Sequence, residues 1–309
     1  QRFGPDGRFL GAWGSYGDGP GEFLDPVGIA VGADGSVYVS DAGNERVQRF
    51  DAAGAYRGQW GRPGRGDGEF NRPAGLAVAP DGTVYVADSR NHRVQWFSPE
   101  GGFRGKVGTP GAGAGEFNRP EDVVVDGADR LYVVDSRNHR IQRFEAGGEF
   151  LGQIAAYGTG PGEVVGPTGI AVDAAGRLVV TDTFNHRLQR FLPTGDPVEI
   201  WGGPGAGVGQ LSNPADVAVG PDGSVYVTDS ANNRVQRFAP DGTVRGAWGT
   251  PDGDDGRFAD PAAVTVSADG TLLVADRVRD RIQRFSPAGV FQAGWGSSGT
   301  AFGQLSAST

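Results

Sequence analysis

The chain of 309 residues carries a formal net charge of -9 at pH 7 and contains neither cysteine nor methionine. The lack of cysteine excludes disulfides, thiolate catalysis and cysteine-ligated zinc, and the negative charge disfavours a general nucleic-acid binder, which needs a basic field to neutralise phosphates. No apolar run approaches the roughly 18 residues of a membrane-spanning helix, so we expect no membrane insertion by this domain.

A unit of 47 residues recurs six times in constant phase. Each unit opens at a proline, namely Pro26, Pro73, Pro120, Pro167, Pro214 and Pro261. A tryptophan series recurs near the unit's end, at Trp13, Trp60, Trp201, Trp248 and Trp295. Because no linker interrupts the period, we expect a single domain over residues 1–309. The repeat cores lie near 26–61, 73–108, 120–155, 167–202, 214–249 and 261–296.

Residues 73–108 show the elements expected in every unit. An apolar strand at 76–79 is followed by a Pro-Asp-Gly turn and by a β-branched and aromatic strand at 83–86. The alternating run at 93–97 predicts a third strand, and residues 102–107 predict a fourth. No stretch shows helical periodicity with caps. Four short antiparallel strands per unit, repeated six times, predict an all-β fold, a six-bladed β-propeller in which the tryptophans pack between adjacent outer strands.

The unit resembles the NHL repeat throughout, from its Pro-x-Gly-[Ile/Leu]-Ala-Val start to the string Asn-His-Arg-x-Gln-Arg-Phe. Three units carry the Asn-His pair, as Asn91-His92, Asn138-His139 and Asn185-His186. The resemblance covers essentially the whole chain and implies the propeller fold. It implies little about function, because propellers host many unrelated roles.

The two ends of the chain carry duplicated sequence, since residues 1–27 repeat in phase as 283–309. The third and fourth strands therefore occur seven times, and the first and second strands six times. NHL-like propellers often close by letting an N-terminal strand complete the last blade. The resemblance thus implies that Arg8–Trp13, within the duplicated segment 1–14, competes with Val290–Trp295 for the outer edge of the sixth blade.

An aspartate followed five residues later by an arginine recurs in all six units. The aspartate ends the second strand and the arginine begins the third, so we expect the two charges to face each other across the hairpin mouth, with Asn91 as a left-handed loop residue. Chemistry is seldom needed six times, whereas a hairpin clamp is needed in every blade. The predicted structural clamps are Asp41/Arg46, Asp88/Arg93, Asp135/Arg140, Asp182/Arg187, Asp229/Arg234 and Asp276/Arg281.

The variable positions between each aspartate and arginine break this symmetry. Resemblance to propellers places these loops on the same face as the glycine-rich loops ahead of each proline. Together the two sets of loops supply a basic and aromatic sector: Arg65, Arg72, Arg90, Arg119, Arg137 and Phe184. One hypothesis is a binding patch for an anionic peptide, glycan or nucleic acid, and the alternative is a set of solvated arginines scattered over a surface.

Carboxylates break the symmetry at a second place. Two residues after the opening proline, the third and fifth units carry Asp122 and Asp216 where other units carry glycine or alanine, and Glu121 precedes Asp122. These residues are candidates for a Ca²⁺ site or a cationic ligand at the channel mouth, with a structural or solvated role as the alternative. Three histidines share one phase, but equivalent loops on neighbouring blades lie too far apart for one zinc ion. They are His92, His139 and His186.

These patterns favour a non-catalytic binding or scaffold propeller acting through its loop face and central channel, without a cofactor. We expect a monomer that binds a protein, peptide or glycan. The alternative is a metal-dependent hydrolase or lyase similar to propeller lactonases, using Asp122 and Asp216. The amidating lyase with NHL-like repeats uses a His-coordinated metal and disulfides, and this chain has no cysteine. A third hypothesis, RNA or another anionic polymer bound on the top face as in animal NHL proteins, is disfavoured by the net charge.

The basic residues are almost all arginine, with Lys106 the only lysine. This bias, with abundant Ala, Gly, Asp and Pro, is typical of a high-GC and thermophilic bacterial source. Because the chain does not begin with methionine, we interpret it as a processed chain or a domain of a longer protein, and we favour an extracytoplasmic or secreted location.

Overall fold

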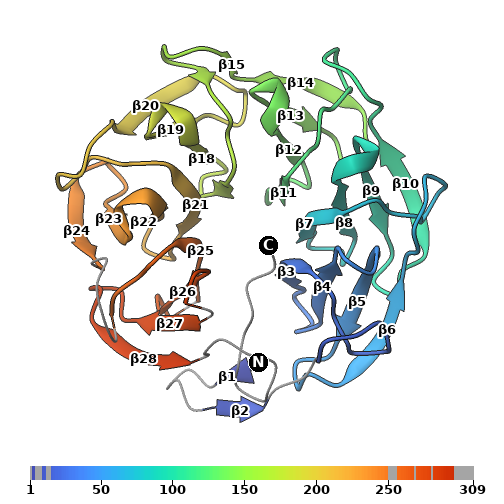
Figure 1. Cartoon of the computed structure of the whole chain (residues 1–309). Helices are drawn as coiled ribbons and strands as arrows, with labels where there is room; N and C mark the ends of the chain where they lie inside the picture. The colour runs from blue at the N-terminus through green and yellow to red at the C-terminus, as the bar shows by residue number, and fades with distance from the viewer. Residues whose placement is uncertain are drawn as a thin grey trace. The chain divides into compact units, whose positions relative to one another are not determined.

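The computed structural model describes residues 2–3, 9–11, 15–249, 256–267, 269–279 and 281–295. Within these residues the fold is all-β, with six four-stranded antiparallel sheets and four short 3₁₀ turns (Figure 1). The sheets are the blades of a β-propeller, which confirms the predicted fold class. No helix of this part of the chain is long and apolar enough to cross a membrane.

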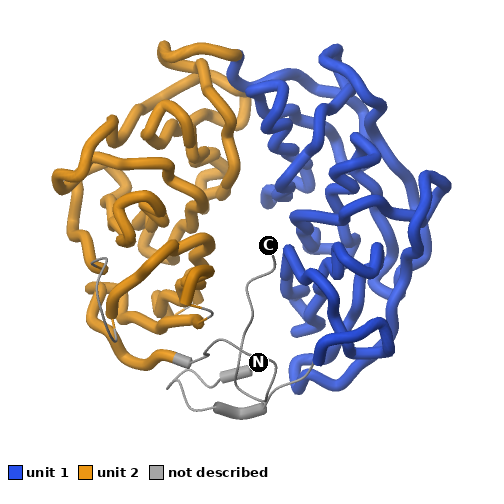
Figure 2. The backbone as a smooth tube through the Cα atoms, viewed as in Figure 1, with its two compact units in different colours: residues 1–2, 11–156, 308 blue, residues 3–10, 157–307, 309 orange. Residues whose placement is uncertain are grey.

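The chain forms two compact units, the first made mainly of residues 11–156 and the second mainly of 157–307 (Figure 2). In unit 1, blade one contains β3 (Pro26–Val31), β4 (Val37–Asp41), β5 (Arg46–Phe50) and β6 (Tyr56–Trp60). Blade two contains β7 (Pro73–Val78), β8 (Val84–Asp88), β9 (Arg93–Phe97) and β10 (Phe103–Val107). Blade three contains β11 (Asp122–Val125), β12 (Leu131–Asp135), β13 (Arg140–Phe144) and β14 (Phe150–Ile154).

In unit 2, blade four contains β17 (Ile170–Val172), β18 (Leu178–Asp182), β19 (Arg187–Phe191) and β20 (Pro197–Gly202). Blade five contains β21 (Pro214–Val219), β22 (Val225–Asp229), β23 (Arg234–Phe238) and β24 (Val244–Trp248). Blade six contains β25 (Pro261–Val266), β26 (Leu272–Asp276), β27 (Arg281–Phe285) and β28 (Phe291–Trp295). The short strands β15 (Ala156–Tyr157) and β16 (Glu163–Val164) pair in the intervening loop.

The outer strand of blade six is β28, which pairs antiparallel with β27. Near the N-terminus, β1 (Arg2–Phe3) and β2 (Phe9–Gly11) pair with each other as a two-stranded sheet. Of the segment Arg8–Trp13, which we expected to compete for that outer edge, only the part in β2 lies within the described residues. The competition between the two ends stays a prediction.

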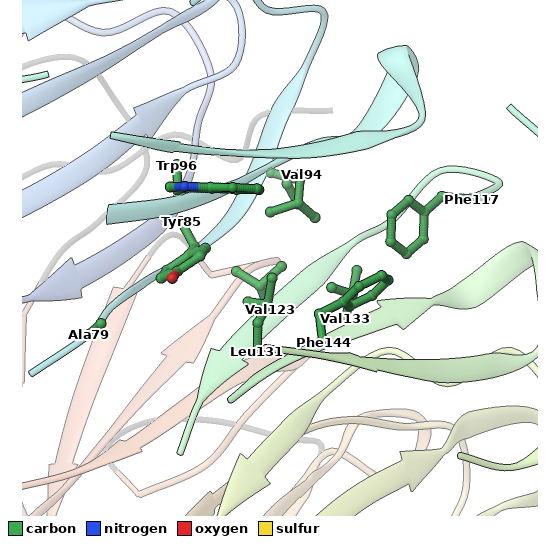
Figure 3. Packing of buried hydrophobic residues seen from close by; sticks show 11 residues of the cluster. Ala79, Tyr85, Val94, Trp96, Phe117, Val123, Leu131, Val133 and Phe144 are labelled. Carbon is green, nitrogen blue, oxygen red and sulfur yellow. The ribbon is translucent and has the colours of Figure 1, made fainter. Parts of the chain in front are cut away.

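Blades two and three share a buried core that connects them directly. Tyr85, Val94 and Trp96 of blade two pack near Phe117 and Leu131 of blade three in one apolar cluster (Figure 3). The alternation of side chains along each strand produces this arrangement, because both faces of β8 and β9 are buried. Fully burying one such large apolar side chain stabilises a fold by about 1.5–3 kcal/mol.

The tryptophan series packs between blades, against glycines in the turn before the next outer strand. A Cβ on Gly101 would lie 2.6 Å from the ring of Trp60, so only glycine fits there. Blade two has Val107 in place of the expected tryptophan. Here Trp96, at a different position on β9, takes over the contact, because a Cβ on Gly148 of blade three would lie 2.7 Å from its ring.

All six predicted Asp–Arg pairs form ion pairs in the structure. The N···O distances are 2.9 Å for Asp41/Arg46, 2.7 Å for Asp88/Arg93, 2.8 Å for Asp135/Arg140, 2.6 Å for Asp182/Arg187, 2.6 Å for Asp229/Arg234 and 3.3 Å for Asp276/Arg281. The aspartates are buried in every blade. A desolvated pair of this kind depends on having its remaining hydrogen-bonding groups satisfied.

In blade two the clamp reaches well beyond its own hairpin. Arg93 donates through Nε to Asp88, and its two Nη groups donate to the carbonyls of Arg65, Gly66 and Glu69. Asp88 Oδ1 accepts from the backbone N–H of Asn71 at 2.8 Å. The pair therefore holds the glycine-rich loop that precedes the blade, in addition to the β8–β9 hairpin.

The prediction that Asn91 is the left-handed residue of this hairpin is wrong. Asn91 ends the 3₁₀ turn η1 (Ser89–Asn91), and the next residue, His92, has the positive φ of 56°. The amide of Asn91 instead donates to Asp88 at 2.9 Å and to the carbonyl of Gly64 at 2.8 Å. Asn91 acts here through the two N–H donors of its side-chain amide, a role that local propensity alone does not reveal.

We predict that Arg93→Lys lowers the free energy of unfolding by about 3 kcal/mol, because one ammonium cannot reproduce a fork that binds a carboxylate and three carbonyls. Arg62→Lys is the matched control, since Arg62 forms an exposed ion pair with Glu69 at 2.8 Å. Such a pair contributes at most about 1 kcal/mol. Urea unfolding of both variants measures the difference, and equal losses would show that the clamp is no more than a surface ion pair.

Candidate functional site

Arg90 and Arg137 occupy the middle of two equivalent 3₁₀ turns, η1 and η2 (Ser136–Asn138). Both arginine side chains are exposed to solvent. The backbone N–H of Arg90 donates to the carbonyl of Asn71, which ties the turn to the preceding loop. In blade five, Ala231 occupies the same position in η4 (Ser230–Asn232), so the turn itself does not require arginine.

Arg72 and Arg119 precede the opening prolines of blades two and three in the left-handed conformation, with φ of 57° and 55°. The equivalent residues in blades four and five are Gly166, with φ of 56°, and Asn213, with φ of 48°. Glycine and asparagine adopt this conformation readily, whereas for arginine it costs about 1–2 kcal/mol. The fold therefore sets the backbone conformation here, and it does not explain the choice of arginine.

Side chains of the preceding blade hold these left-handed residues in place. Glu45 accepts a hydrogen bond through Oε2 from the backbone N–H of Arg72, and Nδ1 of His92 accepts one from Arg119 at 3.3 Å. In unit 2, Nδ1 of His186 accepts in the same way from Asn213 at 3.0 Å. This inter-blade role was not predicted from the sequence, although the constant phase of the histidines was a signal for it.

Glu121 lies among three of the predicted arginines. Burial raises the pKa of Glu121, while the charges of Arg72, Arg119 and Arg137 act in the opposite direction. Arg90 and Arg72 both lie near Glu45. Burial raises the pKa of Glu45, and the charges of Arg90 and Arg72 oppose that rise. We call this set the arginine surface; it comprises Arg72, Arg90, Arg119, Arg137 and the carboxyl of Glu121.

Three guanidinium groups of the arginine surface form no ion pair with any residue that the structure describes. Arg72 contacts Asp25 at 3.4 Å, but Arg90, Arg119 and Arg137 pair with no carboxylate in the described part of the chain. Many other arginines pair with a nearby acid, including Arg49, Arg57, Arg62, Arg104, Arg130, Arg177 and Arg277. The arginine surface therefore combines three arginines that form no ion pair among the described residues, in a chain of net charge -9.

Two other members of the predicted sector are not part of this set. Arg65 is exposed on the glycine-rich loop, and its backbone carbonyl accepts a hydrogen bond from Arg93. Phe184, 62% exposed, is in η3 (Thr183–Asn185) of unit 2, where its ring covers Gly166 so closely that a Cβ would collide with it. Phe184 and the arginine surface thus belong to different units.

The carboxylates predicted at the channel mouth accept backbone hydrogen bonds. Asp216 accepts from the N–H of Val217 at 2.8 Å and from that of Val264, on β25, at 2.9 Å, so it links blades five and six. Asp122 accepts from the N–H of Val123 at 2.9 Å. Asp122 belongs to unit 1 and Asp216 to unit 2. Among the described residues, no three His, Asp or Glu side chains gather as a metal site.

Burial raises the pKa of Asp216 to about 6, from its usual 3.8. The folded protein therefore holds this proton more tightly than the unfolded chain, and the stabilising contribution of Asp216 is complete below about pH 4 and lost as the pH rises through about 6. We predict that Asp216→Ala, which matches Ala263 of blade six, destabilises the protein more at pH 4 than at pH 7, by at most about 3 kcal/mol.

Urea unfolding between pH 4 and pH 7 measures this difference. Asp222→Ala is a control of opposite sign: partial burial acts to raise the pKa of Asp222, but hydrogen bonds from Ser224 and the charge of Arg237 lower it overall. Its stabilising contribution should therefore decline towards low pH. If the loss of unfolding free energy in Asp216→Ala increased with pH, the raised pKa of Asp216 would be contradicted.

Sequence comparison matches the NHL repeat model to residues 23–50, 70–97, 117–144, 165–191 and 211–238. Each matched segment runs from the end of a glycine-rich loop through the third strand, and so contains one Asp–Arg clamp. No protein of curated function matches the chain significantly in sequence.

Several solved structures share the fold. A streptogramin B lyase has a TM-score of 0.70 at 18% identity, covering 87% of this chain and 82% of that chain. A catalytically inactive histidine-to-alanine variant of virginiamycin B lyase from Staphylococcus aureus, solved with quinupristin, has a TM-score of 0.70 at 17% identity, covering 86% and 83%. The hydrazine synthase of Kuenenia stuttgartiensis has a TM-score of 0.68 at 18% identity, covering 85% and 77%. These identities support a common fold alone.

Proposed function

Because this chain belongs to the NHL-repeat family of β-propellers, we propose that it is a non-catalytic binding module whose ligand carries carboxylates and binds the arginine surface of blades two and three. A propeller hosts many functions, so the proposal must depend on the site. The observation that carries it is a set of three guanidiniums that lie near Glu45 or Glu121 and form no ion pair with any described residue, namely Arg90, Arg119 and Arg137.

Unpaired guanidiniums close to one another repel, and a bound anion removes that repulsion. The guanidinium fork donates two parallel hydrogen bonds to a carboxylate, which makes such contacts strong and directional. A long polyanion fits less well, because acidic groups such as Asp25, Glu45 and Glu121 lie among the arginines. A peptide with a few carboxylates matches this mixed charge better than a nucleic acid does.

The arginine surface has a rigid base, which lowers the entropic cost of binding. The buried cluster that includes Trp96 and Phe117 joins blades two and three, the blades that carry this surface. The backbone N–H groups of Arg72 and Arg119 are held by Glu45 and His92. The left-handed conformation of both arginines adds support, because strain of this kind is found preferentially at functional sites.

We predict that Arg90→Ala and Arg137→Ala each weaken binding of an N-acetylated hexaglutamate peptide by about 5- to 30-fold, the loss of one charge-assisted hydrogen-bond pair. Ala231 occupies the same turn position in blade five, so alanine is compatible with the fold. Isothermal titration calorimetry at low salt measures the dissociation constants. Arg245→Ala, an exposed arginine on β24, is the control; an equal loss in this variant would leave only nonspecific charge attraction.

We further predict opposite effects of Arg119→Asn on stability and binding. Asparagine relieves the left-handed strain, as at Asn213, and should raise the free energy of unfolding by about 0.5–1 kcal/mol while the peptide binds more weakly. Urea unfolding and calorimetry on the same sample measure both quantities. If stability and affinity fell together, Arg119 would be a structural residue.

Catalysis is the competing function, and the histidines provide a test of it. His92 and His186 both use Nδ1 to accept a backbone hydrogen bond, so each is committed to holding the next blade. We predict that quinupristin, incubated with the protein with and without Mg²⁺ or Ca²⁺ and followed by liquid chromatography, remains unchanged. Conversion of quinupristin that is lost in a His92→Ala or His186→Ala variant would replace the binding proposal with a lyase.

A further inference from the structure

Glu121 stands at a position where no other blade carries a charge. The equivalent residues, one after the opening proline, are Val27, Ala74, Thr168, Ala215 and Ala262. Ala74 is fully buried in blade two, so a small apolar side chain satisfies the fold at this place. A carboxylate here therefore requires an explanation other than folding.

The backbone of Glu121 is fixed at the junction of blades two and three. Its N–H donates to the carbonyl of Val134 on β12 at 3.1 Å, and its carbonyl accepts from the N–H of Gly75 on β7 at 2.9 Å. These two bonds hold its Cα at a constant place relative to the arginine surface. The side chain of Glu121 therefore extends from a backbone that is hydrogen-bonded to both blades.

The carboxyl group of Glu121 has neighbouring cations but no direct partner. Arg72, Arg119 and Arg137 lie close enough to act on it electrostatically. Nevertheless, within the described part of the chain, the carboxyl accepts no hydrogen bond and forms no ion pair. Neither carboxyl oxygen is a buried atom without a partner, so this carboxylate reaches solvent and is open to a donor group of a ligand.

This carboxylate changes what the arginine surface can bind. A ligand that carries only negative charge would gain from the guanidiniums but would be repelled by Glu121. A ligand with a compact cation beside its carboxylates would gain from both. An α-ammonium group is such a cation, and in a peptide it lies within one residue of the first acidic side chain.

We propose that the ligand of the arginine surface is the free amino-terminal end of an acidic peptide, with its α-ammonium on Glu121 and its carboxylates on Arg119 and Arg137. This inference depends on the proposed function, because it assigns the ligand of the same surface. Glu121 acts by selecting the ligand: it favours peptides with a free amino terminus over the same peptides with a blocked one.

A matched pair of peptides tests the selection. Tetraglutamate with a free amino terminus and its N-acetylated form differ only in the ammonium charge. Calorimetry at pH 6.5, where an α-amino group with its usual pKa near 7.7–8.0 is protonated, is expected to show at least a tenfold preference of the wild type for the free peptide. At pH 9.5, where the amine is neutral, the preference is expected to fall to less than threefold.

Glu121→Ala and Glu121→Gln are the test variants, and urea unfolding verifies that each is folded. Both are expected to lose the preference, and to do so partly by binding the acetylated peptide more tightly than the wild type does, a gain that a damaged fold would not produce. Arg137→Ala is expected to weaken both peptides while retaining the preference.

The outcomes separate the two proposals. If the wild type binds both peptides equally, or if the preference survives in Glu121→Ala, the role of Glu121 is overturned while the arginine surface stands. If neither peptide binds, the proposed function itself fails. A third peptide is acidic and acetylated but contains one internal lysine. Tight binding of this peptide would overturn the choice of an amino terminus as the ligand.

Discussion

The buried ion pair between an aspartate at the end of a second strand and an arginine at the start of a third is the interaction on which each blade depends. In blade two, Arg93 binds Asp88 and three carbonyls of the preceding loop. Buried ion pairs are weak evidence for stability by themselves, because desolvation opposes the attraction. Here the arginine also binds carbonyls of the preceding loop, so the pair fixes that loop together with its hairpin.

Because the clamps fix the loop backbones, the middle residue of each 3₁₀ turn can differ between blades. The same 3₁₀ turn carries Arg90 in blade two and Ala231 in blade five without changing shape. Differences between blades are therefore the places to look for function. The arginine surface and Glu121 are such differences, and the left-handed Arg72 and Arg119 show that stability is lost there without a folding reason.

Neighbouring blades are joined by hydrogen bonds as well as by apolar contacts. Glu45 and His92 each accept the N–H of a left-handed residue in the following blade, and Trp60 packs on a glycine of the following blade. This arrangement couples the loops that carry Arg72 and Arg119 to the packing between the blades. A ligand on the arginine surface would therefore meet a preorganised site and would pay little to order it.

The sequence alone determined the blade count, the strand order and the Asp–Arg pairs, because a 47-residue period and alternating strands leave few other ways to bury the apolar faces. It also identified Arg72, Arg119, Arg137 and Glu121 as candidates. Only the tertiary structure decided that His92 is the left-handed residue and holds the next blade, and that Trp96 replaces a missing tryptophan. These roles depend on contacts between blades, which have no signature in the spacing of residues within one repeat.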